Sequence, residues 1–269
     1  MYFLSPLDDN RERANQSRNV MSYVTVDYEV SEQIATVRLN RPECLNAMNR
    51  QLVDDVAGAF RQANADDKAR VILFCGAGRA FCAGDDRRAH QHFETEAEAR
   101  EFVDAIQQAS REILFGEKLV VGAIQGWAVG GGFEWALNCD FSLWASGARA
   151  FFPEVNLNLL VTGGITSLLP AIVGLNKARE MLLLGEHYSA PSLQDLGIAW
   201  RVVEEDALLP EARALAARLA ALPMHSSRSI KRVLNRVAAV SLETALQLET
   251  DATVDGFLDP ETTRLLQDF

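Results

Sequence analysis

Short apolar runs alternate with helical segments along the middle of the chain, and no other feature of the sequence limits the fold as strongly. Val71–Cys75 and Val120–Ile124 are apolar runs of strand length, and a glycine-bearing turn follows each of them. Between these runs, residues 96–114 carry apolar side chains at helical spacing. Strands that alternate with helices are typical of proteins with parallel sheets. The sequence therefore predicts an α/β fold.

The periodicity of the flanking segments predicts the other elements. We expect a β-hairpin over residues 23–39, a helix from a cap at Asn46 to about Ala63, a short helix over 132–137 and a strand over 141–144. After Val203 only helical periods occur, over 208–222, 227–237 and 241–257. We therefore divide the chain into a flexible extension at residues 1–20, a core at 21–205 and a C-terminal helical region at 206–269.

Composition excludes several classes of protein. With 48% hydrophobic residues in a length of 269, the chain can bury a full core, so a disordered or fibrous protein is excluded. A net charge of -11 argues against nucleic acid as a partner, because phosphate backbones require basic surfaces. No apolar stretch is long enough to span a bilayer, so we expect no membrane association. The four cysteines have no CxxC spacing, which predicts reduced thiols and a cytoplasmic location.

Familiar metal and nucleophile motifs are missing at the spacings that they require. The sequence contains no GxSxG turn, and its four histidines show no HExxH pairing. The pair His90 and His92 could ligate a metal, but we interpret it as the solvated start of a helix. We therefore predict no metal site.

Two glycine-bearing turns carry the strongest signal for chemistry. Phe81–Asp86 follows the first apolar run, and Trp127–Glu134, which contains three successive glycines, follows the second. Glycine lets the main chain approach a ligand closely, and the start of a helix offers N–H groups that have no acceptor within the helix. Two such N–H groups can hold a thioester oxygen while it gains negative charge. The alternative is that both turns serve packing alone.

Glu134 and Glu154 form a second candidate constellation. Both lie among apolar neighbours such as Phe133 and Phe152. Burial of an ionised carboxylate is costly, so we expect a raised pKa, which suits a group that transfers protons near neutral pH. Taken singly, each glutamate could instead be a surface or capping residue.

The order of these motifs resembles the crotonase superfamily, which contains enoyl-CoA hydratases and isomerases, from Met21 to Phe269. Any one of the motifs is weak, but their order and spacing together are specific. The matching segments are Arg41-Pro42, Leu45-Asn46-Ala47, Arg79-Ala80-Phe81-Cys82-Ala83-Gly84 with Asp86, Gly126-Trp127-Ala128-Val129-Gly130-Gly131-Gly132 with Glu134, Cys139-Asp140, and Pro153-Glu154-Val155.

The resemblance implies a spiral of repeated ββα units with C-terminal helices that build a homotrimer, often within a dimer of trimers. It also implies acyl-coenzyme A thioesters as substrates, with coenzyme A as part of the substrate and no permanently bound cofactor or metal. Carried over residue by residue, the oxyanion-hole N–H groups belong to Asp85 and Gly131, and the acid/base pair is Glu134 and Glu154.

Retention of both glutamates favours an enoyl-CoA hydratase that adds water across the C2=C3 bond to give a 3-hydroxyacyl-CoA. Glu134 is expected to deprotonate the water, and Glu154 to protonate C2. The alternatives are another crotonase-type reaction, namely isomerisation, dehalogenation or hydration with carbon–carbon cleavage, and a non-catalytic acyl-CoA- or RNA-binding protein. Arg87 and Arg88 could bind coenzyme A phosphates, or they could neutralise Asp85 or form an exposed ion pair. The full set of candidate substrate or coenzyme A contacts is Cys44, Leu45, Ala83, Asp86, Arg87, Arg88, Gly130 and Lys231.

Some residues depart from the family pattern. Asp85 replaces a small residue, and we interpret its side chain as a cap of the following helix or as a contact to a polar acyl group. Residues 156–164 lack the usual proline and place Asn156 and Asn158 near Glu154. Trp127 and Trp135 flank the glycines and either line the acyl pocket or fill the core.

Overall fold

The computed structural model describes residues 23–89, 93–237 and 242–268. The predicted flexible extension at 1–20 and the histidines His90 and His92 lie outside these residues. The strands are β1 (Val26–Ser31), β2 (Ile34–Leu39), β3 (Val71–Gly76), β4 (Leu119–Ile124), β5 (Trp127–Val129), β6 (Phe141–Ala145), β7 (Arg149–Phe151), β8 (Tyr188–Ser189) and β9 (Arg201–Val203).

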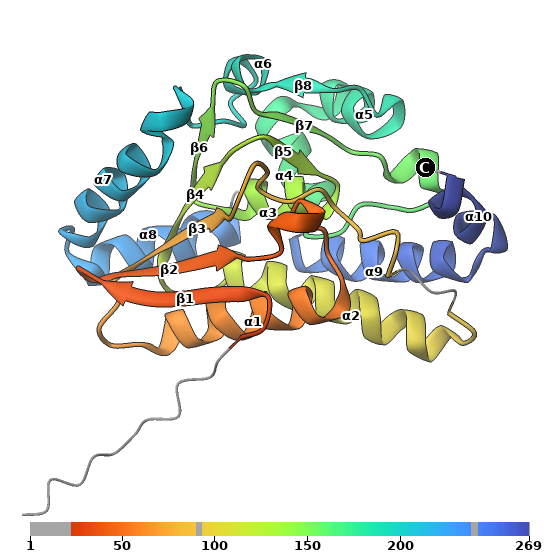
Figure 1. Cartoon of the computed structure of the whole chain (residues 1–269), viewed down its shortest axis with the longest axis horizontal. Coiled ribbons are helices and arrows are strands. Elements are labelled where there is room, and N and C mark those ends of the chain that lie inside the picture. The colour runs from red at the N-terminus through yellow and green to blue at the C-terminus, as the bar shows by residue number, and fades with distance from the viewer. Residues whose placement is uncertain (1–22, 90–92, 238–241, 269) are drawn as a thin grey trace, which may run out of the picture.

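Helices connect and cover these strands (Figure 1). Three short 3-10 helices accompany them, η1 (Pro42–Cys44), η2 (Glu154–Leu157) and η3 (Glu205–Ala207). The α-helices are α1 (Arg50–Ala65), α2 (Glu96–Leu114), α3 (Gly131–Asn138), α4 (Ile165–Val173), α5 (Leu175–Leu184), α6 (Ala190–Asp195), α7 (Leu208–Ala220), α8 (Met224–Val237), α9 (Leu242–Leu258) and α10 (Pro260–Asp268).

The strands form two sheets. The larger has six strands in the order β1-β2-β3-β4-β6-β9, and the smaller has the order β5-β7-β8. In the large sheet β1 and β2 are antiparallel, and every other neighbouring pair is parallel. The predicted α/β class is confirmed, and so is the hairpin, whose turn residues Glu32 and Gln33 adopt the left-handed conformation that a two-residue hairpin turn requires.

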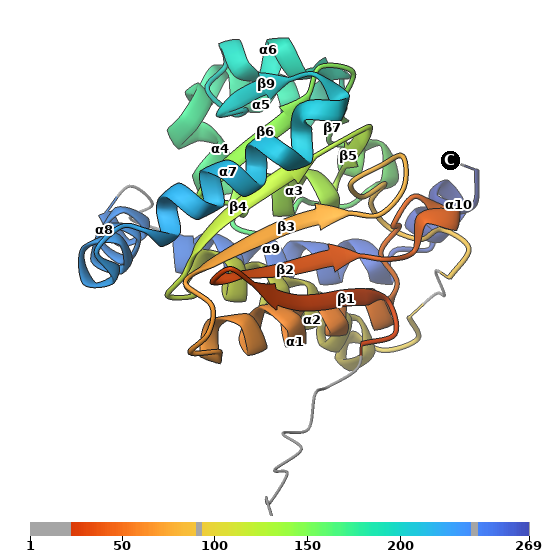
Figure 2. The same cartoon turned by 60° about the vertical axis from the view of Figure 1, so that its left-hand side comes forward.

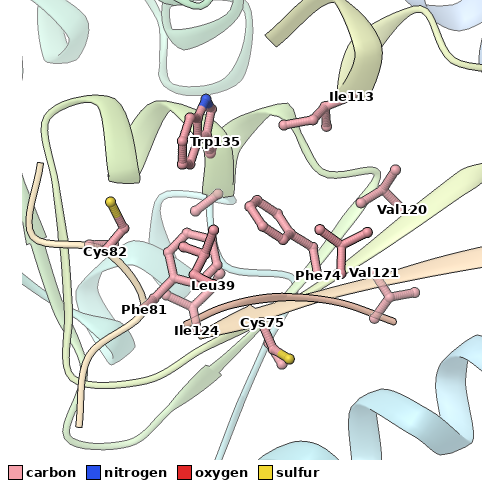
Figure 3. Packing of buried hydrophobic residues seen from close by; sticks show 14 of the residues in the cluster. Leu39, Phe74, Cys75, Phe81, Cys82, Ile113, Val120, Val121, Ile124 and Trp135 are labelled. Carbon is pink, nitrogen blue, oxygen red and sulfur yellow. The ribbon is translucent and has the colours of Figure 1, made fainter. Parts of the chain in front are cut away.

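The central strand β3 is buried on both faces. Helix α7 packs on β2, β3, β4 and β6, and Figure 2 shows it in front of the part of the sheet that contains β4 and β6. On the other side, Phe74 of β3 makes edge-to-face contacts with Phe60 of α1 and Phe81, at centroid distances of 5.0 and 5.1 Å. Figure 3 shows Trp135 of α3 packed over the same cluster. Cover on both faces explains why β3 is apolar throughout rather than alternating.

One predicted helix start is wrong. Helix α1 is capped by Asn49, whose Oδ1 accepts from the N–H of Leu52 at 2.9 Å. Asn46 is fully buried and does something else: its Oδ1 accepts from the N–H of Arg41, and its Nδ2 donates to the carbonyl oxygens of Ala77 and Ala80. Both asparagines suit a cap by residue type, and only the long-range contacts of Asn46 decide between them.

The C-terminal helices are confirmed, and the structure adds α10, which the sequence analysis did not predict. Helix α9 packs on α2 and α4, and Figure 1 shows α2 and α9 side by side beneath the sheet. The division of the chain at residue 205 stays a prediction. Among the described residues, no helix is both long enough and apolar enough to cross a bilayer.

Lys231 joins α8 to the core. Its side chain is 2% exposed, and its Nζ donates to the carbonyl oxygens of Ile113 and Lys118 and to Oδ2 of Asp140, at 2.9, 2.9 and 2.8 Å. An ammonium that is buried with three acceptors has no capacity left for a phosphate group. The expectation that Lys231 binds coenzyme A is therefore wrong.

Replacing Lys231 by methionine is expected to destabilise the fold by about 3 kcal/mol, because the change leaves the carboxylate of Asp140 and two carbonyl oxygens without their buried donor. Urea unfolding followed by circular dichroism measures this loss. The matched control is Lys177→Met, which removes a partly exposed surface pair with Glu180 and is expected to change the free energy of unfolding far less than Lys231→Met does. Equal losses in the two variants would contradict the assigned role.

Candidate active site

The two glycine-bearing turns lie side by side. The N–H of Cys82 donates to the carbonyl oxygen of Trp127, and the N–H of Val129 donates to that of Cys82, both at 3.0 Å. The N–H of Phe81 also donates to Gln125, at 2.8 Å. These backbone bonds place the turn after β3 directly against the turn after β4, as the sequence analysis requires.

The geometry of both turns suits the two predicted oxyanion donors. The N–H of Met48 donates to Gly84 and the N–H of Asp86 donates to Met48, at 2.7 and 2.8 Å. Because alternate residues of an extended segment face opposite sides, the N–H of Asp85 is directed away from Met48. Gly131 is the first residue of α3, so its N–H has no acceptor within that helix. Asp85 and Gly131 line the same cavity.

Gly130 and Gly131 lie in close contact with neighbouring side chains. Gly130 has φ +50°, and a Cβ added there would lie 2.5 Å from Oε1 of Glu154. A Cβ at Gly131 would lie 2.7 Å from the sulfur of Met48 and 4.0 Å from Oε2 of Glu134. The two glutamate carboxyl groups therefore lie against neighbouring glycines, and a side chain at 130 would exclude Glu154 from its place.

Glu134 is buried and held by one residue. The N–H of Thr162 donates to Oε1 at 2.8 Å, and the Thr162 hydroxyl contacts Oε2 at 2.5 Å. Burial raises the pKa of Glu134 to about 7, the bonds from Thr162 act in the opposite direction, and the charge of Glu249 raises the pKa further. The bonds from Thr162 favour the ionised form of this carboxyl group.

Glu154 has a different environment. It opens η2, and its Oε2 is buried with no hydrogen-bond partner among the described residues. Burial raises the pKa of Glu154 well above its ordinary value, and the charge of Glu134 raises it further. Because Oε2 receives no donor and the neighbouring carboxylate repels a second charge, the protonated form of Glu154 is favoured.

A small cavity and a larger one meet at this site. The small cavity, of ≈ 100 Å³, lies between the two glutamates and an apolar wall that includes Leu157, Phe257 and Leu266. The larger cavity, of ≈ 590 Å³, shares the lining residues Ala83, Asp85, Arg87 and Leu266 with the small one. The predicted coenzyme A contacts Cys44, Leu45, Ala83, Asp86, Arg87 and Arg88 all line the larger cavity, and Gly130 lines the small one.

The structure decides several of the open interpretations. Asp85 does not cap a helix, because the next α-helix in the described residues begins at Glu96. Asp86 is 8% exposed and paired with Arg41 at 2.8 Å, so it fixes its turn as well as lining the cavity. Trp135 is fully buried in the core, and Trp127 packs on Phe151 and His187; neither lines the small cavity.

Asn158 also lies outside the lining of the small cavity. Its Nδ2 donates to Asp259 and to the hydroxyl of Thr262 at 3.0 and 3.3 Å, so Asn158 connects the end of η2 to the start of α10.

The described residues contain no cluster of three or more His, Cys, Asp or Glu side chains that could hold a metal ion. Thr162 was missed as a site residue. Its only signal was that it lies in the segment that departs from the family pattern.

Comparison with known proteins agrees with the fold and with the motifs. A family model described as enoyl-CoA hydratase/isomerase matches residues 29–263. A crotonyl-CoA hydratase from Syntrophomonas wolfei is 32% identical over 233 residues, covering 86% of this chain and 89% of that protein. A 1,2-epoxyphenylacetyl-CoA isomerase from Escherichia coli is also 32% identical, over 226 residues, covering 82% of this chain and 86% of that protein.

Solved structures show the same architecture. An enoyl-CoA hydratase from Mycobacterium avium subsp. paratuberculosis superposes with a TM-score of 0.85 at 27% identity, covering 92% of this chain and all of that one. The OdaA protein of Pseudomonas aeruginosa superposes with a TM-score of 0.83 at 28% identity, covering 91% of this chain and 98% of that one. The chain thus has the crotonase fold and belongs to the enoyl-CoA hydratase/isomerase family.

Proposed function

We propose that this protein is an enoyl-CoA hydratase, and the unequal environments of Glu134 and Glu154 carry the proposal. Hydration of an enoyl thioester needs a base for the attacking water and an acid for C2. Thr162 favours the charged form of Glu134, whereas the buried, unbonded oxygen of Glu154 favours its protonated form. Two carboxyl groups whose environments differ in this way can act as base and acid in the same step.

The backbone N–H groups of Asp85 and Gly131 supply the electrostatic part of the mechanism. They donate to the thioester oxygen, which draws electrons from the conjugated double bond and makes C3 electrophilic. As water attacks C3, negative charge collects on that oxygen, and the donors stabilise it. Glu134 removes a proton from the water while the water oxygen bonds to C3, and Glu154 delivers its own proton to C2. One water has then been added to the substrate, and Glu134 is protonated while Glu154 is ionised. Transfer of one proton from Glu134 to Glu154 restores the starting state.

The larger cavity is the proposed coenzyme A site. Arg87 and Arg88 are exposed along it and offer positive charge to phosphate groups on a chain whose net charge is -11. An isomerase remains the second candidate, because one relative at 32% identity carries that name.

We also propose that the protein is a homotrimer or a dimer of trimers in the cytoplasm. Its subunit contact would include Ile230, Val233 and Leu234 of α8, since these apolar side chains are more than half exposed.

The test of the function is the loss of enoyl-thioester ultraviolet absorbance with a panel of short, branched and aromatic 2-enoyl-CoA substrates. Glu134→Gln and Glu154→Gln are each expected to lower kcat by about 10² to 10⁴, because each removes one proton-transfer group. The matched control is Glu211→Gln on the outer side of α7, which is expected to keep wild-type kcat. Near wild-type hydration by Glu154→Gln would contradict the assigned roles.

The pH profile of kcat/KM is expected to be bell-shaped. Glu134 must be ionised to act as base, and its pKa of about 7 means that activity falls as the pH drops below neutral. Glu154 must be protonated, so activity falls again at higher pH, where it ionises. Thr162→Val removes the hydroxyl bond that favours the charged form of Glu134, so the acid limb should move to higher pH. An acid limb that does not move would contradict this assignment.

Arg87→Ala and Arg88→Ala are each expected to raise KM for a coenzyme A thioester by up to about tenfold, with little change in kcat, because a solvent-exposed contact to phosphate contributes about 1 kcal/mol. The measurement is repeated with a pantetheine thioester, which lacks the phosphate groups of the nucleotide, and the difference between variant and wild type should then disappear. Arg61→Ala, on the exposed side of α1, is the control. Equal effects on both thioesters would show that the arginines do not bind phosphate.

A further inference from the structure

A buried carboxylate on α9 caps α4. Glu249 is fully buried, and its Oε2 accepts from the N–H of Gly164 at 2.7 Å. Its Oε1 accepts from the N–H and the hydroxyl of Thr166, at 2.8 and 2.7 Å. The residue at the N-cap position of α4 is Gly164, which has no side chain to satisfy the first N–H groups of the helix. The cap is therefore supplied by a residue 85 positions later in the chain.

The segment that Glu249 holds is also the segment that holds Glu134. Thr162, Gly163 and Gly164 are consecutive, and Thr162 provides both hydrogen bonds to the Glu134 carboxyl group. Gly163 and Gly164 have φ of +66° and +73°, a left-handed conformation that glycine adopts readily but that does not by itself fix the chain. Contacts from outside the segment must therefore set its position.

Those contacts come from three helices. The N–H of Gly163 donates to Oε1 of Gln107 in α2 at 3.0 Å, and its carbonyl oxygen accepts from Nδ2 of Asn138 in α3 at 2.9 Å. Glu249 in α9 accepts one hydrogen bond from Gly164, the residue that follows Gly163, and two from Thr166. Of these anchors Glu249 alone carries charge, and bonds from N–H groups to a carboxylate are stronger than bonds between neutral groups.

We propose that Glu249 is a positioning residue: by anchoring Gly164 and Thr166, it holds Thr162 in the place from which Thr162 orients the Glu134 carboxyl group. This inference rests on the proposed function only in giving Glu134 the role of base. The charges of Glu249 from α9 and Glu154 from η2 act on Glu134, and the ionisable side chains of Asp85 and Arg87 line the same cavity. Glu249 itself does not reach the cavity wall.

The variants are Glu249→Gln, Glu249→Ala and Glu249→Asp, compared with Glu243→Gln, which makes the same chemical change at a 70% exposed position of the same helix. Glu249→Gln and Glu249→Ala are expected to lower kcat about 10- to 100-fold while KM changes less than about threefold, because a misplaced base slows the chemical step and leaves the coenzyme A cavity intact. Glu249→Asp keeps both acceptor oxygens and should recover part of kcat.

A double-mutant cycle separates positioning from general destabilisation. If Glu249 acts through Thr162, the loss in kcat caused by Glu249→Gln should be smaller in a Thr162→Val background than in wild type. The proposal would be overturned if Glu249→Gln lowered kcat by the same factor in the Thr162→Val background as in wild type. It would also be overturned if Glu249→Gln and Glu243→Gln had equal kcat.

Hydrogen exchange of the peptide that contains residues 159–166 is the readout that does not depend on activity. In the Glu249→Gln variant the amide hydrogens of this peptide should exchange faster than they do in wild type or in Glu243→Gln, while those of β3 exchange at an unchanged rate. Faster exchange in a protein that hydrates no enoyl-CoA would refute the proposed function and leave the anchoring contact in place. Hydration that persists in the Glu249 variants at wild-type kcat would refute the positioning role and leave the function in place.

Discussion

The site depends on the backbone pairing of two turns that follow neighbouring parallel strands. Cys82 pairs with Trp127 and Val129, and this pairing brings the segment of Asp85 against the start of α3. Every later feature follows from it: Gly131 begins a helix at the cavity, and Gly130 leaves room for the carboxyl group of Glu154. Parallel strands end at the same edge of a sheet, so loops that follow them are close together in space. The sheet thus provides a rigid support for donors that belong to the main chain.

Electrostatics then gives two like residues different roles. Glu134 and the Oε2 atom of Glu154 are both buried, and burial raises the pKa of each carboxyl group. Thr162 partly reverses that effect at Glu134, while Oε2 of Glu154 has no donor among the described residues. A negative charge on Glu134 makes ionisation of Glu154 less favourable, so the pair favours one ionised and one protonated carboxyl group. The proposed hydration requires this combination of one ionised and one protonated carboxyl group.

Local patterns predicted most of the fold. Apolar periodicity located α2 at both of its ends, and glycine placement located both turns of the site. Predictions that depend on distant contacts were less successful. Asn46 has the residue type of a helix cap, but contacts from Arg41 and Ala80 bury it elsewhere, and the ammonium of Lys231 is fully used by Asp140 and two carbonyl oxygens. Thr162 and Glu249 could not be assigned from sequence, because both act through distant contacts: Thr162 bonds Glu134 of α3, and Glu249 of α9 bonds Gly164 and Thr166 at the start of α4.

The most direct measurement of the central claim is the mass of the product that forms from a 2-enoyl-CoA in heavy-oxygen water. The account predicts that wild-type protein incorporates one heavy oxygen, located at C3 of a 3-hydroxyacyl-CoA, because the oxygen comes from the water that Glu134 deprotonates. A product of unchanged mass in which only the double bond has moved would contradict the account, since it would show that the two carboxyl groups transfer protons without adding water.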